Sequence, residues 1–295
     1  MKRVLSFIFA GCICWGVIQG YNTLTDGFSL QQMKSQLPLD SRFDPPPLPQ
    51  EEKQKLQHMI AQKFRYIGKG CQFYAFASED GKWVIKFLKQ KHLKPWTELQ
   101  QIPMPRQVRE HADRQIRKRQ ERVENLFFSC QLAYSELSEE SGLLYIHLNR
   151  VPGLEREVTL IDKMGLHHRV NVDEYEFILQ RRARSVKEVF AAASKEEIGE
   201  KIDQLISLVH SRCSKGIRDR DRSFVQNVAF YEKGALFIDI GQFYKDETIL
   251  AKEEEQKDLK RRLGNLRYWT EKNFPQYLHD VEKRLADLTE ASTIH

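Results

Sequence analysis

The residues best suited to catalysis lie in the stretch "GIRDRDRSFVQNVAFYEKGALFIDIG", residues 216–241. Three carboxylates and one amide gather there around a short β-type segment: Asp219, Asp221, Asn227 and Asp239. Carboxylate and amide oxygens are the hard ligands that suit Mg²⁺. A further carboxylate could accept a proton from a hydroxyl nucleophile. The stretch therefore predicts a site for a divalent cation and a phosphate, because a solvent-exposed turn needs no such collection.

Two short β runs are expected to position these side chains. "NVAFY" and "ALFIDI" are separated by "EKG", a turn that contains glycine, and such runs pair as a hairpin. Asn227 begins the first strand and Asp239 lies near the end of the second, so the two are neighbours in an antiparallel hairpin. The loop with Asp219 and Asp221 comes directly before Asn227. We therefore expect the oxygen ligands to converge at one end of the hairpin.

A β-rich stretch precedes this site. Residues 64–90 predict strands around Gly68 and Gly70, a "SEDGK" turn and the alternating strand "WVIKFL". Lys86 is a lone cation in the middle of that last strand. It is expected either to lie exposed on an edge strand or to point into a cleft.

Helices make up much of the remaining sequence. Residues 105–137 predict a long helix with an apolar stripe and a basic surface. The clearest helix starts at Ser194, where Glu197 completes a capping box, and it ends at Gly216. Residues 246–290 are amphipathic. The order of strands, one helix, more strands and a mostly helical half predicts an α+β fold of two lobes.

The N-terminus is predicted to direct the chain to a membrane. Lys2 and Arg3 precede the apolar run "VLSFIFAGCICWGVIQG", which is typical of a signal peptide or membrane anchor over residues 1–21, with a buried helix as the alternative. Residues 22–55 are polar and contain three consecutive prolines, which predict an extended linker. The chain is thus expected to be membrane-anchored or exported, and the side of the membrane stays open.

The bulk composition permits a phosphate-rich ligand. The net charge is +6, with 30% charged residues of both signs, so an anionic membrane surface is also permitted and no nucleic acid partner is expected. The five cysteines show neither a disulfide framework nor the spacing of a zinc site.

Taken in order, these motifs resemble the protein-kinase-like superfamily. "IGKGCQFYAF" is similar to the glycine loop that covers the phosphates, and "VIKF" to the strand with the phosphate-binding lysine. "GIRDRDRSFVQN" is similar to the catalytic loop, and "DIG" to the metal-binding Asp-Phe-Gly. The resemblance spans residues 64–245. It implies an N-lobe at residues 56–180 and a C-lobe at residues 181–295.

The resemblance implies a role for each matching residue of the catalytic half. Asp221 would orient or deprotonate the acceptor hydroxyl, while Asn227 and Asp239 would hold Mg²⁺. Asp219 stands where the family has a histidine, and we interpret it as a residue that stabilises the loop rather than as a metal ligand.

The resemblance also implies an ATP site. Lys86 would neutralise the α- and β-phosphates, and a glutamate of the following helix would fix it, with Glu124 preferred over Glu110 and Glu121. Gln180 would lie at the hinge between the lobes. The residues implied to contact the nucleotide are Gly68, Lys69, Gly70, Lys86, Glu124 and Gln180.

The chain also departs from the family pattern. Phe73 stands where a third glycine is usual, and one extra residue separates Asp221 from Asn227. No Ala-Pro-Glu segment follows the "DIG" motif. The chain is therefore more similar to the atypical or small-molecule kinases than to typical protein kinases.

Three functions stay open. The first is an ATP- and magnesium-dependent phosphotransferase that acts on a hydroxyl of a protein or a small molecule. The second is a pseudokinase that binds nucleotide or serves as a scaffold. The third is a membrane-tethered interaction domain of unrelated α+β fold, whose basic helix binds anionic lipid. An exported kinase would need a supply of ATP in its compartment, whereas an anchored chain with its domain in the cytosol would use cytosolic ATP.

Overall fold

The computed structural model describes residues 15–16, 19–90 and 102–290. The chain divides into two compact units: unit 1 holds residues 1–122 and 145–179, and unit 2 holds residues 123–144 and 180–295. Unit 1 contains most of the strands and unit 2 most of the helices, which confirms the predicted α+β class. The two units interleave along the sequence, so the boundary near residue 180 is only one of three crossings.

Unit 1 is built on a mixed sheet whose seven strands follow the order β4-β7-β3-β2-β1-β5-β6. The strands are β1 (Lys63–Lys69), β2 (Phe73–Ser78), β3 (Trp83–Leu88), β4 (Leu143–His147), β5 (Glu157–Ile161), β6 (His167–Asn171) and β7 (Phe177–Arg181). β2 pairs antiparallel with β1 and β3, whereas β5 runs parallel to β1. The predicted Asp-Gly turn joins β2 to β3, where Gly81 has φ +73°. Phe64, Phe76 and Phe87 are fully buried in the core of the sheet.

The segment from Tyr21 to Ile60 forms part of unit 1. It contains α2 (Leu30–Met33), the 3-10 turn η1 (Ser41–Phe43) and α3 (Gln50–Ile60). Phe28, Met33 and Phe43 are buried. This differs from the extended linker predicted for residues 22–55. The apolar side chains are widely spaced there, and their burial against the sheet leaves no periodic pattern in the sequence.

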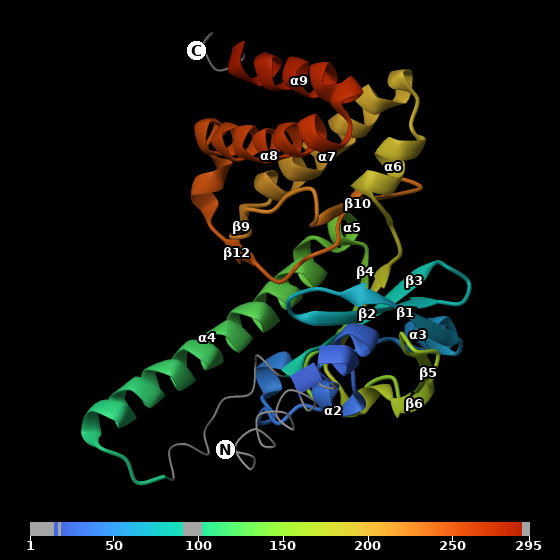
Figure 1. Cartoon of the computed structure of the whole chain (residues 1–295), viewed down its shortest axis with the longest axis vertical. Coiled ribbons are helices and arrows are strands. Elements are labelled where there is room, and N and C mark those ends of the chain that lie inside the picture. The colour runs from blue at the N-terminus through green and yellow to red at the C-terminus, as the bar shows by residue number, and fades with distance from the viewer. Residues whose placement is uncertain (1–14, 17–18, 91–101, 291–295) are drawn as a thin grey trace, which may run out of the picture. The chain divides into compact units, whose positions relative to one another are not determined.

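The predicted long helix is α4 (Arg106–Glu136), drawn in green in Figure 1. Most of its predicted apolar stripe is covered, since Ile116, Val123 and Phe127 are buried. Val108, which lies on the same stripe, is 53% exposed. Among the described residues, the stripe is therefore exposed near the start of the helix and buried from Ile116 to Phe127.

Unit 2 holds α5 (Ser138–Ser141), α6 (Val186–Ala192), α7 (Lys195–Ser214), α8 (Lys252–Asn273) and α9 (Leu278–Glu290). The predicted capping box of α7 is present, because the Ser194 hydroxyl accepts from the Glu197 amide and the Glu197 carboxylate accepts from the Ser194 amide. α7, α8 and α9 pack on one another (Figure 1).

Five short strands complete unit 2: β8 (Arg184–Ser185), β9 (Ile217–Asp219), β10 (Val228–Tyr231), β11 (Gly234–Phe237) and β12 (Phe243–Lys245). They form one sheet of order β11-β10-β8 and a separate pair, β12-β9. Short 3-10 turns lie at η4 (Val172–Glu174) in unit 1 and at η5 (Glu247–Leu250) and η6 (Pro275–Tyr277) in unit 2.

Most of the predicted signal peptide or anchor, residues 1–21, lies outside the described residues. Of the helices that the structure describes, none has both the length and the apolar composition needed to cross a membrane.

Candidate active site

The predicted hairpin is present and brings Asn227 next to Asp239. β10 and β11 pair antiparallel, with Val228 opposite Phe237. Asn227 directly precedes β10, and its carbonyl accepts the amides of Ile238 at 2.8 Å and of Asp239 at 3.4 Å. The two residues therefore meet at the open end of the hairpin, as the sequence predicts.

The side chains of Asn227 and Asp239 offer oxygens at this end. The Asn227 Nδ2 donates to the Ser223 carbonyl at 3.0 Å, which fixes the amide and leaves its oxygen as the group that could face a cation. Asp239 is half-buried, and one of its carboxylate oxygens accepts the Gly241 amide at 3.2 Å. The other oxygen is left for a ligand.

This donor set fits Mg²⁺ that arrives with a nucleotide. In proteins Mg²⁺ commonly binds one or two carboxylates together with the phosphates of the substrate. In the parts of the chain that the structure describes, no three His, Cys, Asp or Glu side chains gather to hold a metal ion. Asn227 and Asp239 could therefore supply only part of a Mg²⁺ coordination shell, and phosphate oxygens would have to supply the rest.

Asp221 lies in the loop between β9 and β10. The Asp219 carboxylate accepts the Asp221 amide at 2.8 Å, and the Asp221 carboxylate accepts the Ser223 amide at 2.8 Å. These two local turns give the loop a defined shape. Asp221 is half-buried and uses one carboxylate oxygen in its turn, so the other oxygen can face a hydroxyl.

Asp219 faces the interior of unit 2. It is 7% exposed, and its carboxylate lies 3.1 Å from Nη2 of Arg262 on α8. Burial raises the pKa of Asp219, while the attraction of Arg262 acts in the opposite direction. These contacts agree with the interpretation of Asp219 as a loop stabiliser.

The "DIG" segment is also fixed from the side of α4. The Ser129 hydroxyl donates to the Ile240 carbonyl and accepts the Phe243 amide at 2.6 Å. Ser129 is not among the residues predicted from the sequence. Its position next to Cys130, on the edge of the predicted apolar stripe, is the signal that could have pointed to it.

In unit 1, Lys86 lies on a central strand. β3 is placed between β7 and β2, and Lys86 is opposite Ala75 in the register with β2. The edge-strand interpretation of this lysine is therefore wrong. Lys86 is half-buried between two fully buried neighbours, Ile85 and Phe87.

The three candidate glutamates of α4 differ in their exposure. Glu110 and Glu121 are exposed, and the Glu110 carboxylate lies 3.0 Å from Arg106 one turn before it. Glu124 is half-buried. The pairing of Glu124 with Lys86 stays a prediction.

The glycine loop joins β1 to β2. Gly68 has φ +152° at a shift in the strand register, a conformation that side chains rarely adopt. The Lys69 ammonium donates to the Asp26 carbonyl at 2.7 Å and lies 3.8 Å from the Asp26 carboxylate. The N-terminal segment thus holds the lysine that was predicted to contact the nucleotide. The Gly70 amide donates to the Phe73 carbonyl at 2.9 Å.

The side chain of Gln180, which was predicted to lie at the hinge and contact the nucleotide, instead bonds to backbone carbonyls of the protein. It is 1% exposed, and its Nε2 donates to the Ser141 carbonyl at 2.5 Å and to the Phe237 carbonyl at 2.9 Å. Both partners belong to unit 2. The Gln180 side chain is therefore committed to the protein, and a nucleotide contact at this position would have to come from the backbone.

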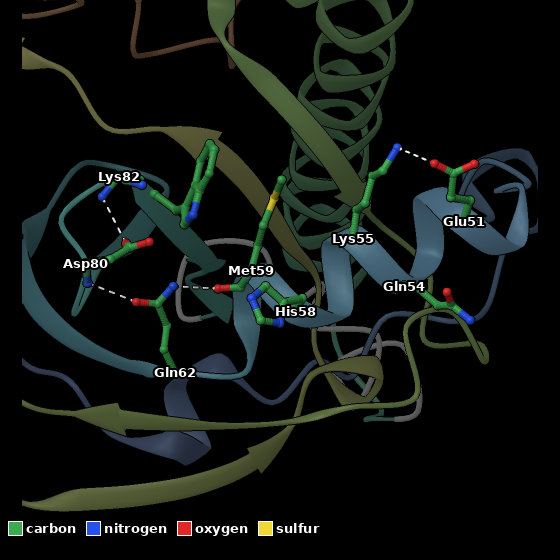
Figure 2. Close-up of a pocket in the computed structure, with 9 residues that line it drawn as sticks. Glu51, Gln54, Lys55, His58, Met59, Gln62, Asp80 and Lys82 are labelled. Carbon is green, nitrogen blue, oxygen red and sulfur yellow. Dashed lines mark hydrogen bonds and ion pairs between the residues drawn. The ribbon is translucent and has the colours of Figure 1, made fainter.

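A groove in unit 1 lies between α3 and the turn that joins β2 to β3 (Figure 2). Its polar groups bind one another: Gln62 donates to the Met59 carbonyl at 2.8 Å and accepts the Asp80 amide at 2.9 Å. None of the predicted site residues lines this groove. We therefore do not assign the candidate site to it.

The elements follow the order of the protein-kinase-like fold that the sequence resembles. The lysine strand β3 comes first, followed by the long helix α4 and the strand β7 that leads to the predicted hinge. α7 then precedes the loop of Asp221, and the β10–β11 hairpin ends at the "DIG" motif. The chain itself divides into one unit that is rich in strands and one that is mostly helical.

Comparisons with known proteins give one kind of match. No protein-family profile and no curated protein matches the chain. Forty-two chains of solved structures match. One is the streptomycin–ATP–APH(2'')-IIa ternary complex, with a match probability of 0.95, 11% identity and a TM-score of 0.28. The match covers 82% of this chain and 99% of that chain. At so distant a likeness, the functional proposal depends on this chain's own residues.

Proposed function

We propose that the chain is an ATP- and magnesium-dependent phosphotransferase that acts on an alcohol group. The observation that carries this proposal is the meeting of Asn227 and Asp239 at the end of the β10–β11 hairpin, directly after the loop of Asp221. One amide oxygen and two half-buried carboxylates, of Asp221 and Asp239, therefore lie within one short segment of unit 2.

The chemistry of phosphoryl transfer needs few groups, because positioning and electrostatic stabilisation supply most of the catalysis. Asn227 and Asp239 would hold Mg²⁺, which neutralises the charge of the phosphates when bound. Asp221 would orient the acceptor hydroxyl and accept its proton. Lys86 would bind the α- and β-phosphates, and the backbone amides of the glycine loop would cover them. We take the acceptor to be an alcohol of a small molecule or a protein.

A nucleotide-binding pseudokinase is the second candidate. The interaction of Lys69 with Asp26 favours the pseudokinase, because Lys69 would have to leave Asp26 before it could contact a phosphate. The phosphotransferase remains the better supported function, because Asp221, Asn227 and Asp239 all keep the side chains that the reaction needs.

Thermal unfolding with and without MgATP, followed by transfer of labelled phosphate from ATP, tests the proposal. We expect MgATP at 100 times its dissociation constant to stabilise the protein by about 2.7 kcal/mol. Chelation of Mg²⁺ or the substitution Asp239→Asn should remove this effect. Asp221→Asn should keep the stabilisation and lose the transfer, whereas Asp287→Asn, an exposed site on α9, should change neither.

The outcomes separate the candidates. Stabilisation without transfer in the unsubstituted protein would identify a pseudokinase. No stabilisation by any nucleotide would contradict both proposals. In that case, vesicle binding that depends on Arg117, Lys118 and Arg119 would favour the membrane-tethered interaction domain.

Attachment to a membrane through residues 1–21 remains a separate proposal. The apolar composition of residues 4–20 supports it. A reporter fused after residue 60 would show on which side of the membrane the folded units lie.

A further inference from the structure

We propose that Arg262 of α8 is a positioning residue that holds the loop of Asp221 in its working shape. This inference rests on the proposed function, because it gives the loop a catalytic purpose. Its structural part, the fixing of the loop by Arg262, can be tested without any activity.

Arg262 binds both ends of the loop. Its Nη2 donates to the Asp219 carbonyl at 3.1 Å, and its Nη1 contacts the Ser223 carbonyl at 3.4 Å. The same guanidinium lies 3.1 Å from the Asp219 carboxylate. A guanidinium is planar and rigid, so its two nitrogens fix the separation of the two carbonyls that flank Asp221.

A set of opposite charges keeps Arg262 in place. Arg262 is 1% exposed and Arg212 of α7 is fully buried. Arg212 bonds to Asp258 of α8 and lies 3.9 Å from the Asp219 carboxylate. The Asp258 carboxylate is also 3.7 Å from Nε of Arg262. The buried part of the cluster thus alternates two cations with two anions, and the exposed Arg261 also bonds to Asp258. Buried charges require such pairing.

α8 contributes a second side chain to the same loop. Asn265, one turn after Arg262, accepts the Phe224 amide at 3.2 Å. Among the described residues, the Asp221 carboxylate bonds only to the Ser223 amide, in one of the turns inside the loop. The conformation of the loop therefore determines the orientation of Asp221, and side chains of α8 fix that conformation.

The contacts of Arg262 are not those expected of a charge cluster that serves stability alone. Buried ion pairs add little net stability over apolar residues of similar size. Here, however, the guanidinium is directed at backbone carbonyls on either side of one candidate catalytic residue. The contacts therefore point to control of loop geometry.

Kinetics give the first test. In Arg262→Gln we expect kcat to fall by about 100-fold, because a shift of about 1 Å in a reacting group can cost this much. The KM for ATP should change little, since Asp239 and Lys86 are untouched. Arg262→Lys keeps the charge but loses the fork of two donors, and it should show an intermediate loss. Arg267→Gln, on the same helix and paired with Glu282 at 2.7 Å, should behave like the unsubstituted protein.

Limited proteolysis gives a second readout that needs no activity. Arg220 and Arg222 are exposed within the loop, so trypsin can report on its order. We expect cleavage after Arg222 to be about tenfold faster or more in Arg262→Gln than in Arg267→Gln, at a temperature well below the unfolding of either.

Each outcome decides the question. Unchanged cleavage and unchanged kcat in a folded Arg262→Gln protein would overturn the proposal. If Arg262→Gln does not fold, Arg262→Lys and Asp219→Asn carry the same two measurements, with faster cleavage again expected. Faster cleavage in a protein that transfers no phosphate even without substitution would refute the proposed function but retain the role of Arg262 in fixing the loop.

Discussion

Single residues at the candidate site fall into two groups. Asn227 and Asp239 owe their meeting to neighbours in the sequence, because one hairpin brings them together. Arg262 and Gln180 owe their roles to distant partners, at Asp219 and Phe237. Arg262 does fall on the apolar face of α8 with Leu259, which is a signal that the sequence offers. The sequence has no comparable signal that Arg262 contacts Asp219.

Burial at the scale of one residue also predicts a pH effect. Glu176 in unit 1 is 2% exposed, and burial raises its pKa above 4.5, although a hydrogen bond with Ser35 and the attraction of Arg150 oppose this. The folded state then binds the proton more tightly than the unfolded state. The free energy of unfolding should therefore fall as pH rises from about 4.5 through the raised pKa. We expect urea unfolding at several pH values in this range to show a smaller decrease in the free energy of unfolding for Glu176→Gln than for the unsubstituted protein. The same pH dependence in both proteins would refute the prediction.

At the scale of elements, local sequence patterns predicted the structure correctly where the interacting residues lie within one helix or one hairpin. The capping box of α7 and the β10–β11 hairpin are of this kind. The N-terminal segment behaved differently. Phe28 packs edge-on against Tyr74 and Phe76, with ring centroids 5.4 and 5.3 Å away, and the Tyr74 hydroxyl donates to the Gly27 carbonyl at 2.7 Å. Three prolines suggested a spacer, yet isolated aromatic side chains attach the segment to the sheet.

The packing of this segment can be measured. Phe28→Ala should lower the free energy of unfolding of unit 1 by about 3–5 kcal/mol, because it removes a buried ring and leaves a cavity. Leu24→Ala, at a site 59% exposed, should cost less than about 0.5 kcal/mol. Urea unfolding followed by the fluorescence of Trp83, in a chain whose other three tryptophans are replaced by phenylalanine, gives both values. A loss below about 1 kcal/mol for Phe28→Ala would show that the segment is not docked in solution.

At the scale of the whole molecule, the units are not consecutive pieces of sequence. Unit 2 needs residues 123–144, which supply Ser129 to the "DIG" segment and the Ser141 carbonyl to Gln180. A division at residue 180, as the sequence predicted, would separate these contacts. The two compact units of the structure therefore each contain residues from both sides of position 144. The lobe bounds implied by the resemblance stay a prediction.

Truncated chains test this organisation. Residues 123–144 joined by a short glycine–serine linker to residues 180–295 should unfold cooperatively. The junction is feasible because the Arg181 amide donates to the Gly142 carbonyl at 2.8 Å. Residues 181–295 alone should lack a cooperative transition. Circular dichroism during heating distinguishes the two, and a sharp transition in the shorter chain would contradict the assignment.

The sequence by itself determined the elements and the chemistry they carry. Periodicity, capping residues and a glycine turn act within a few residues, so α7, the hairpin and the pairing of Asn227 with Asp239 follow from local rules. Only the tertiary structure decided that Lys86 lies on a central strand, that Phe28 is buried and that Arg262 binds the loop of Asp221. These are contacts between residues far apart in the chain. Such contacts are stabilised by burial and charge pairing, and neither produces a regular spacing of residues in the sequence.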